Sequence, residues 1–283
     1  MRFLSVICAF CLAATCLAQD IRVPASNVAG SVVTISTTGA GKAVFYLTGP
    51  GIARKNDIEP GHDIRIESQY LQNAGMYLAL ICTDTCRSGN FYVNAAKPAS
   101  LTFLVHPSRV PVAQQNAISG VVFAFDRFRN LVVLPEAVNF QLNAGSSSLF
   151  AHSDRTQGGV AWFRTTSGKS AAPVQVTASL NNLEARRAVQ QVASDPCNLR
   201  ITGQRITKGI LVETEPVHDC AGNAVPDGTI VSFTANGPDG KSTVDAPIKQ
   251  GVARAQIAGS KSAVVSVASG IVMGNELRIG AQP

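Results

Sequence analysis

The chain has 283 residues but few charged side chains and few aromatic ones. Charged residues make up 15% of it and aromatic residues 6%, with a single tryptophan. Globular proteins usually carry about a quarter charged residues, so the surface of this protein must rely on Ser, Thr, Asn and Gln. The net charge is only +6, and no run of five or more Lys or Arg occurs, which argues against nucleic-acid binding. Hydrophobic residues at 46% supply ample core material and exclude a disordered chain.

The motifs of common active sites are also missing. The four histidines stand singly, and neither a His-Glu-x-x-His motif nor a Gly-x-Ser-x-Gly elbow occurs. Gly39–Lys42 and Gly240–Ser242 resemble a phosphate-binding loop but lack its four-residue spacer and following helix. Oxygen-bearing side chains between 219 and 239 could bind calcium, yet the EF-hand order is absent and Asx turns are the better interpretation. We therefore predict a protein that is not an enzyme and holds neither cofactor nor metal.

Residues 1–18 have the features of a secretory signal peptide. Arg2 precedes an apolar stretch, and Cys16 and Ala18 place small residues at −3 and −1 of a cleavage site after Ala18. A retained membrane anchor needs about 18 or more apolar residues. A lipid-linked Cys16 is disfavoured because Thr15 before it makes a poor lipobox. The protein is therefore predicted to be exported to the periplasm, the cell surface or the extracellular space, with no transmembrane segment in the mature chain.

Export determines how the cysteines are interpreted. Three of the seven lie in the signal peptide, which leaves Cys82, Cys86, Cys197 and Cys220. An even number in an oxidising compartment indicates two disulfides, and four cysteines allow three pairings. Proximity in the sequence favours Cys82–Cys86 and Cys197–Cys220. Cys82 and Cys86 could also form half of a zinc site, but no further Cys or His ligands lie at the usual spacings.

The secondary-structure signals are almost all of the β type. Apolar residues alternate in short runs separated by Gly, Pro, Asn and Ser, and turn signals recur about every ten residues, as in β-sandwiches and barrels. Strands are predicted at 31–35, 42–47, 63–67, 76–80, 120–125, 138–142, 174–178 and 230–234. The segment Leu180–Val192 has a helical look, but we interpret Asn181 and Asn182 as a hairpin turn between two strands.

An internal repeat relates two parts of the chain at an offset of 93 residues. Matched positions are Asp126, Asn130, Val132 and Phe140 in one copy and Asp219, Asn223, Val225 and Phe233 in the other. The offset is close to the length of one immunoglobulin-type sandwich, about 100 residues. We expect each Asn to adopt the left-handed conformation at a sharp turn and each Asp to accept hydrogen bonds from the turn amides. Alternation then points both Phe side chains at the core.

The second copy carries a resemblance to a known family. Asp219 is followed by Gly-Asn-Ala-Val-Pro and then by Val-Ser-Phe ending at Phe233, with Gly-Val-Ala at 251–253. This pattern resembles the bacterial Ig-like group 1 domain, the repeated module of the invasin and intimin adhesins. The first copy departs from it, because Arg129 replaces the Gly and the Pro is shifted to Pro135. The resemblance covers residues 99–283 and implies tandem immunoglobulin-like β-sandwich domains, whereas residues 19–98 carry only the strand pattern.

The predicted organisation is a signal peptide over 1–18 and β-sandwich domains over 19–98, 99–194 and 195–283. The predicted function is non-catalytic: adhesion, another interaction, or structural spacing, with an unidentified protein or polysaccharide of the cell envelope or extracellular space as partner. The alternative is a carbohydrate- or polymer-binding accessory protein of the envelope. That role requires aromatic side chains exposed on one face, and we expect Trp162 instead in the core or at a domain junction.

Overall fold

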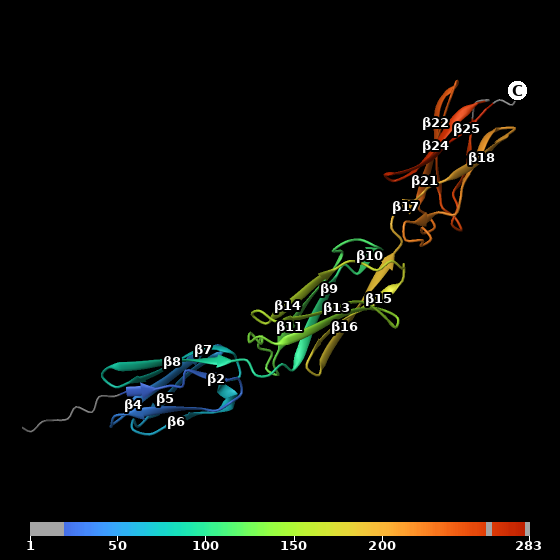
Figure 1. Cartoon of the computed structure of the whole chain (residues 1–283). Coiled ribbons are helices and arrows are strands. Elements are labelled where there is room, and N and C mark those ends of the chain that lie inside the picture. Colours follow the sequence, from blue (N-terminus) through green and yellow to red (C-terminus); the bar gives the residue numbers. More distant parts are fainter. Residues whose placement is uncertain (1–19, 259–261, 281–283) are drawn as a thin grey trace, which may run out of the picture. The chain divides into compact units, whose positions relative to one another are not determined.

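A computed structural model describes residues 20–258 and 262–280 (Figure 1). These residues form 25 strands and one 3-10 helix, η1 (Ser68–Tyr70), and contain no α-helix. The predicted all-β fold class is confirmed. The signal peptide predicted over 1–18 lies outside the described residues.

The strands between residues 20 and 94 form two sheets around one hydrophobic core. The smaller sheet has the order β1 (Asp20–Arg22), β3 (Val33–Thr38), β6 (Ile64–Ile66). The larger sheet has the order β2 (Ser26–Val28), β8 (Cys86–Asn94), β7 (Gly75–Cys82), β4 (Ala43–Gly49), β5 (Ile52–Ile58). Their inward side chains, such as Ile35, Phe45 and Phe91, are buried together. We refer to this part as the first sandwich.

The strands between residues 100 and 192 repeat this arrangement as the second sandwich. Its larger sheet has the order β10 (Arg109–Pro111), β16 (Leu183–Val192), β15 (Pro173–Leu180), β12 (Ala137–Ala144), β13 (Ser147–Arg155). Its smaller sheet has the order β14 (Val160–Thr165), β11 (Ile118–Phe125), β9 (Ser100–His106). The ring of Phe140 on β12 lies 4.9 Å from that of Phe163 on β14 and 6.2 Å from that of Phe103 on β9, so the two sheets pack through aromatic side chains.

The third sandwich comprises the strands between residues 196 and 279. Its four-stranded sheet has the order β22 (Gly240–Pro247), β21 (Ile230–Gly237), β24 (Ala263–Ser269), β25 (Val272–Ile279). A three-stranded sheet has the order β18 (Ile201–Ile206), β19 (Gly209–Thr214), β23 (Arg254–Ile257), and β17 (Pro196–Cys197) pairs with β20 (His218–Asp219). Phe233 is fully buried in the core between these sheets.

The larger sheets of the three sandwiches share the order of four strands and the register of their central pair. Strands β4, β12 and β21 are equivalent, as are their antiparallel neighbours β7, β15 and β24. Phe45, Phe140 and Phe233 occupy the same inward position, and all three are buried. The residue after each Phe points outward and faces a residue of the neighbouring strand. These outward pairs are Tyr46 with Leu80, Gln141 with Thr177, and Thr234 with Ser266.

Every strand predicted from the sequence is present, and the hairpin prediction is confirmed. Strand β15 ends at Leu180 and β16 begins at Leu183, with Asn181 in the left-handed conformation at φ 52°. Primed turns require this conformation, which Asn tolerates better than other residues with a side chain.

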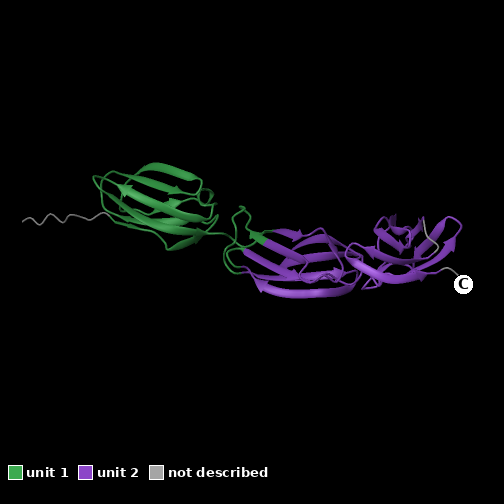
Figure 2. Ribbon diagram, turned by 90° about the horizontal axis from the view of Figure 1, so that it is seen from above, with its two compact units in different colours: residues 1–101, 123–135, 157–159 green, residues 102–122, 136–156, 160–283 purple. Residues whose placement is uncertain are grey.

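The chain groups into two compact units (Figure 2). Unit 1 contains residues 1–101, 123–135 and 157–159, and unit 2 contains 102–122, 136–156 and 160–283. The loop that follows β11 therefore belongs to the same unit as the first sandwich. The predicted division into domains at 98/99 and 194/195 stays a prediction, although among the described strands no sheet combines members of two predicted domains.

Candidate functional site

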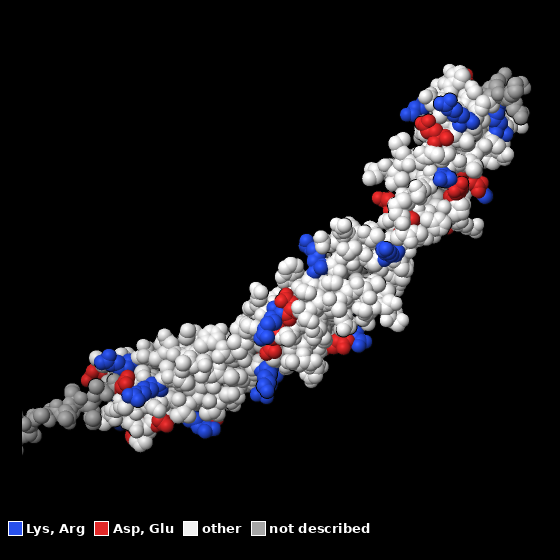
Figure 3. Space-filling model, in the orientation of Figure 1, with Lys and Arg blue, Asp and Glu red and all other residues white. Residues whose placement is uncertain are grey.

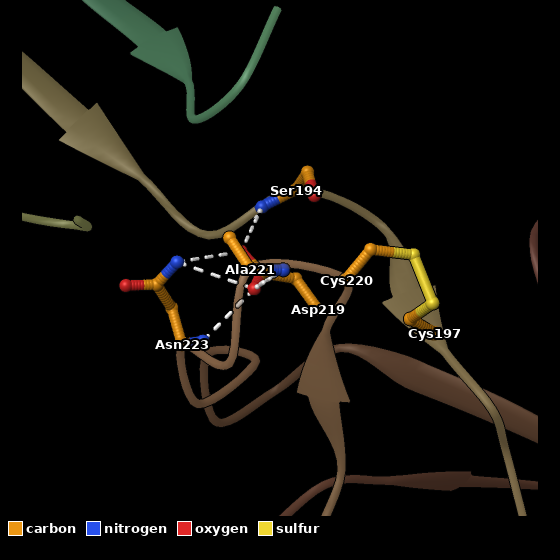
Figure 4. The surroundings of a disulfide bond; sticks show 6 residues. All are labelled: Ser194, Cys197, Asp219, Cys220, Ala221 and Asn223. Carbon is orange, nitrogen blue, oxygen red and sulfur yellow. Dashed lines mark hydrogen bonds between the residues drawn. A yellow bond between two sulfur atoms is a disulfide. The ribbon is translucent and has the colours of Figure 1, made fainter. Parts of the chain in front are cut away.

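The carboxylate of Asp219 is buried beside the segment that leads out of β16 (Figure 4). Its Oδ1 accepts hydrogen bonds from the backbone N–H groups of Ala221 and Asn223, each at 2.8 Å. Its Oδ2 accepts one from the backbone N–H of Ser194 at 3.0 Å. One carboxylate thus organises its own turn and also binds the chain between the second and third sandwiches.

The side chain of Asn223 reaches the loop before β15. Its Nδ2 donates to the carbonyl oxygen of Lys169 at 2.8 Å, and its Oδ1 accepts from the N–H of Ala171 at 2.8 Å. The same Nδ2 also lies 3.0 Å from Oδ2 of Asp219, which holds the amide in place. All of these residues belong to unit 2.

The first copy of the repeat makes the same set of bonds within unit 1. Asp126 accepts from the N–H groups of Phe128 and Asn130 at 2.8 Å and from the N–H of Ala96 at 2.9 Å. Asn130 donates from Nδ2 to the carbonyl oxygen of Gln72 at 2.7 Å and accepts at Oδ1 from the N–H of Ala74 at 2.8 Å.

We call each Asp and Asn pair, Asp126 with Asn130 and Asp219 with Asn223, an Asp–Asn clamp. Both clamps bind two parts of the preceding chain: the linker amide, through the carboxylate, and a loop of the preceding sandwich, through the amide side chain. Every group bound on the preceding side is a backbone N–H or C=O. The sequence predicted the internal turn but gave no signal for this reach, which depends on residues more than 50 positions upstream.

Both carboxylates titrate below the ordinary range. Burial raises the pKa of Asp219, but hydrogen bonds from the backbone and side chain of Asn223 and from the N–H groups of Ser194 and Ala221 outweigh it, so the pKa lies below 3.8. Burial of Asp126 is likewise outweighed by hydrogen bonds from Asn130, Ala96 and Phe128, and its pKa is also lowered. Each clamp is therefore ionised at neutral pH.

The prediction that Asn130 and Asn223 adopt the left-handed conformation was wrong. The left-handed residues are the ones before them, Arg129 at φ 68° and Gly222 at φ 85°. The side chain of each Asn bonds both to the Asp of its own turn and to a loop outside it. The replacement of Gly by Arg at 129 places a residue with a Cβ where the backbone favours glycine.

The clamp in unit 1 is reinforced by an aromatic contact. Gly30, at φ 75°, packs against Phe128, and a Cβ at Gly30 would lie 2.3 Å from Cζ of that ring. Phe128 also packs against the hydrophobic core of the first sandwich. The equivalent position in the other clamp is Ala221, so the two clamps share their polar bonds but not this contact.

Both predicted disulfide pairings are confirmed, Cys82–Cys86 and Cys197–Cys220. Cys197 lies on β17, and Cys220 directly follows the clamp residue Asp219 (Figure 4). The bond thus links the start of the third sandwich covalently to the loop that carries the clamp. The two cysteines are 23 positions apart in the sequence, so the bond closes a loop of that length.

The disulfide Cys82–Cys86 closes the tip of the β7–β8 hairpin, where the two cysteines are direct cross-strand partners. β7 begins at Gly75, so this tip is at the opposite end of the strand from Ala74, which the clamp binds. An open hollow of about 800 Å³ lies beside it, lined by 40–44, 57–59 and 82–84. The disulfide holds one wall of this hollow in place.

The expectation for Trp162 was wrong. It lies on β14 and is 63% exposed, not buried in the core or at a junction. In the alternating pattern of β14 its neighbours Ala161 and Phe163 point inward, so Trp162 points outward.

Charged side chains are scattered on the face shown in Figure 3, with broad uncharged areas between them. Within the described part of the chain, no three His, Cys, Asp or Glu side chains are grouped so that they could hold a metal ion. No helix in the same residues has the length and apolarity needed to cross a membrane.

Comparisons with known proteins give structural likeness only. No protein-family model matches the chain, and no curated protein matches it. Among solved structures, the adhesin FdeC of Escherichia coli is 15% identical, with a TM-score of 0.64, over 94% of this chain and 96% of that one. Invasin, a bacterial integrin-binding protein, is 14% identical with a TM-score of 0.53. This match covers 94% of the present chain and 60% of the invasin structure.

The fold is that of tandem Ig-like β-sandwiches. At these identities the likeness to bacterial adhesins shows the fold alone, and what those adhesins bind does not transfer to this chain.

Proposed function

We propose that this protein is an exported, non-catalytic chain of Ig-like modules that acts in adhesion or other interactions at the cell surface or outside the cell, or as a structural spacer there. The observation that carries the proposal is the Asp–Asn clamp, which occurs twice, each time bound to the same three kinds of group: a linker N–H, a loop C=O and a loop N–H. A joint repeated in this way supports a protein built of successive modules, as a display or spacer protein requires.

The two disulfides support export, because such bonds persist in oxidising compartments and are rare in the cytosol. The division into domains over 19–98, 99–194 and 195–283 and the signal peptide over 1–18 are part of the same proposal. So is its partner, a protein or polysaccharide of the cell envelope or extracellular space.

The proposal is tested in two steps on the full chain. Expression in its own cells, followed by fractionation and protease treatment of intact cells, should place the processed protein outside the cytosol. Purified mature protein should then retain a partner from envelope extracts, or connect tethered domains without one, and show no turnover in a broad hydrolase screen. A cytosolic, unprocessed protein or a turnover abolished by one point mutation would contradict the proposal.

The exposure of Trp162 favours one alternative, the binding of carbohydrate or a related polymer, because sugars stack on exposed aromatic rings. Trp162 is the single tryptophan, so its fluorescence reports directly on this position. Titration with cell-wall polysaccharides should change that fluorescence if the alternative holds, and Trp162→Ala should abolish retention on the same polymer. Unchanged emission with every polymer would reject it.

A further inference from the structure

The outward face of the larger sheet in the first sandwich carries a group of apolar side chains. On the three inner strands, β4, β7 and β8, they form one continuous strip beside Thr48, Ser88 and Asn90. We call it the apolar strip, and its members are Val44, Tyr46, Leu78, Leu80, Met76 and Tyr92. Direct cross-strand partners within it are Tyr46 with Leu80 and Met76 with Tyr92. Met76 is 57% exposed and Tyr92 38% exposed.

The strip is separate from the core of its own sandwich. The inward side chains of the same strands, such as Phe45, Tyr77 and Ile81, make the core, and alternation points the strip to the other side of the sheet. The partly buried apolar residues that pack on this core include Val23, Ile52 and others but no member of the strip. The strip is therefore not explained by the packing of the sandwich.

The other two sandwiches provide an internal comparison. At the position of Tyr46 and Leu80 the second sandwich has Gln141 and Thr177, and the third has Thr234 and Ser266. At this central pair the other two sandwiches thus carry polar side chains where the first carries apolar ones, whereas the third sandwich has Val264 at the position of Leu78. Antiparallel sheets commonly have one solvated, polar face, and both other sheets follow that rule at this pair.

The geometry points to the apolar strip as a docking surface for a second copy of this chain. The centre of the strip carries no charge. Its rim on β5 carries one charge of each sign, Lys55 and Asp57, both exposed and neither in an ion pair with a described residue. A twofold interface brings a surface against itself, so it needs a neutral centre and a rim without an excess of one sign. Tyr and Met side chains within an uncharged strip that has a polar rim match the composition of protein interfaces.

The small size of the strip indicates a weak association. Three strands about 4.8 Å apart and roughly 20 Å of strand length give an area of about 300 Å² per copy. A stable complex buries about 800 Å² per partner, so the expected association is weak and concentration-dependent. Dissociation constants between about 1 μM and 1 mM correspond to such contacts.

Sedimentation of the purified full chain over that concentration range is the test. The weight-average mass should rise toward that of a dimer. Leu80→Lys places a charge at the centre of the strip and should reduce the association constant at least tenfold. Matched controls are Thr177→Lys and Ser266→Lys, which place the same charge at the equivalent positions of the other two sandwiches and should associate like the wild type.

A second variant keeps the test decisive if Leu80→Lys fails to fold. Tyr46→Gln combined with Leu80→Thr reproduces the outward pair of the second sandwich and should also remain monomeric, with an unchanged thermal transition. A wild-type chain that stays monomeric throughout overturns the inference, including the case in which a different protein binds the strip. Association that persists in both strip variants overturns it as well. Neither result bears on whether the protein is exported and non-catalytic.

Discussion

The side-chain nitrogen of Asn223 lies 2.8 Å from the carbonyl oxygen of Lys169, 54 residues earlier in the chain. Asn130 makes the equivalent bond to Gln72, 58 residues earlier, at 2.7 Å. Two residues of the same repeat therefore bind the same kind of group in two different loops. The two copies of the repeat therefore share the hydrogen bonds of the Asp–Asn clamp.

Removal of one clamp amide should loosen the chain locally. Asn223→Ala deletes the bonds to Lys169 and Ala171, each worth about 0.5–1.5 kcal/mol. Amide hydrogen exchange of residues 169–171 and 193–195 should accelerate roughly tenfold or more, since about 1.4 kcal/mol corresponds to a factor of ten. The control is Asn236→Ala, an exposed asparagine on β21. Equal exchange in both variants would show that the clamp bonds contribute nothing.

Acid should weaken the clamps. Because the folded-state pKa values of Asp126 and Asp219 lie below 3.8, their ionised forms stabilise the fold at higher pH, and that stabilisation is lost as the pH falls below about 4 and through the folded pKa. Thermal transitions measured between pH 7 and pH 2.5 should therefore fall less steeply in Asp219→Asn than in the wild type. The variant should be less stable at pH 7, because a neutral amide cannot accept from all three N–H groups equally well. Parallel pH profiles would contradict this assignment.

The left-handed residue before each Asn offers a pair of opposite substitutions. Arg129→Gly should raise the free energy of unfolding by about 0.5–1 kcal/mol, because a left-handed residue with a Cβ costs about 1–2 kcal/mol and the added freedom of glycine in the unfolded chain offsets part of the gain. Gly222→Ala should lower it by about 1 kcal/mol, since nothing lies within 4 Å of the added Cβ and the cost is conformational. Urea titration of both variants measures the two signs, and a shared sign would refute the strain argument.

The two disulfides should differ in their contribution. Cys197→Ala with Cys220→Ala opens a separation of 23 residues and should lower the free energy of unfolding by about 3 kcal/mol, whereas Cys82→Ala with Cys86→Ala opens a separation of 4 and should lower it by about 2 kcal/mol. Guanidinium titration under non-reducing conditions compares the two double variants. A larger loss of unfolding free energy on removal of Cys82–Cys86 than on removal of Cys197–Cys220 would contradict the loop-closure argument.

The sequence predicted what depends on local pattern. Alternation located the strands, the period of the repeat gave the equivalence of Phe140 and Phe233, and proximity gave both disulfides. It did not predict the bonds of Asn130 and Asn223, because their partners are backbone groups in loops whose own side chains carry no signal. It misplaced Trp162, because the sequence does not show which face of β14 is covered. The apolar strip was also invisible, since half-buried Leu78 and Leu80 look like core residues until the register assigns them to the outer face.

The clamp recognises only main-chain atoms of the module before it. Gln72, Ala74 and Ala96 in one case, and Lys169, Ala171 and Ser194 in the other, contribute no side chain to the joint. The polar part of each joint therefore depends on the backbone shape of the preceding loop and linker and not on their side chains. The sequence of these loops can drift without loss of the polar bonds, whereas the contact of Phe128 requires glycine at position 30.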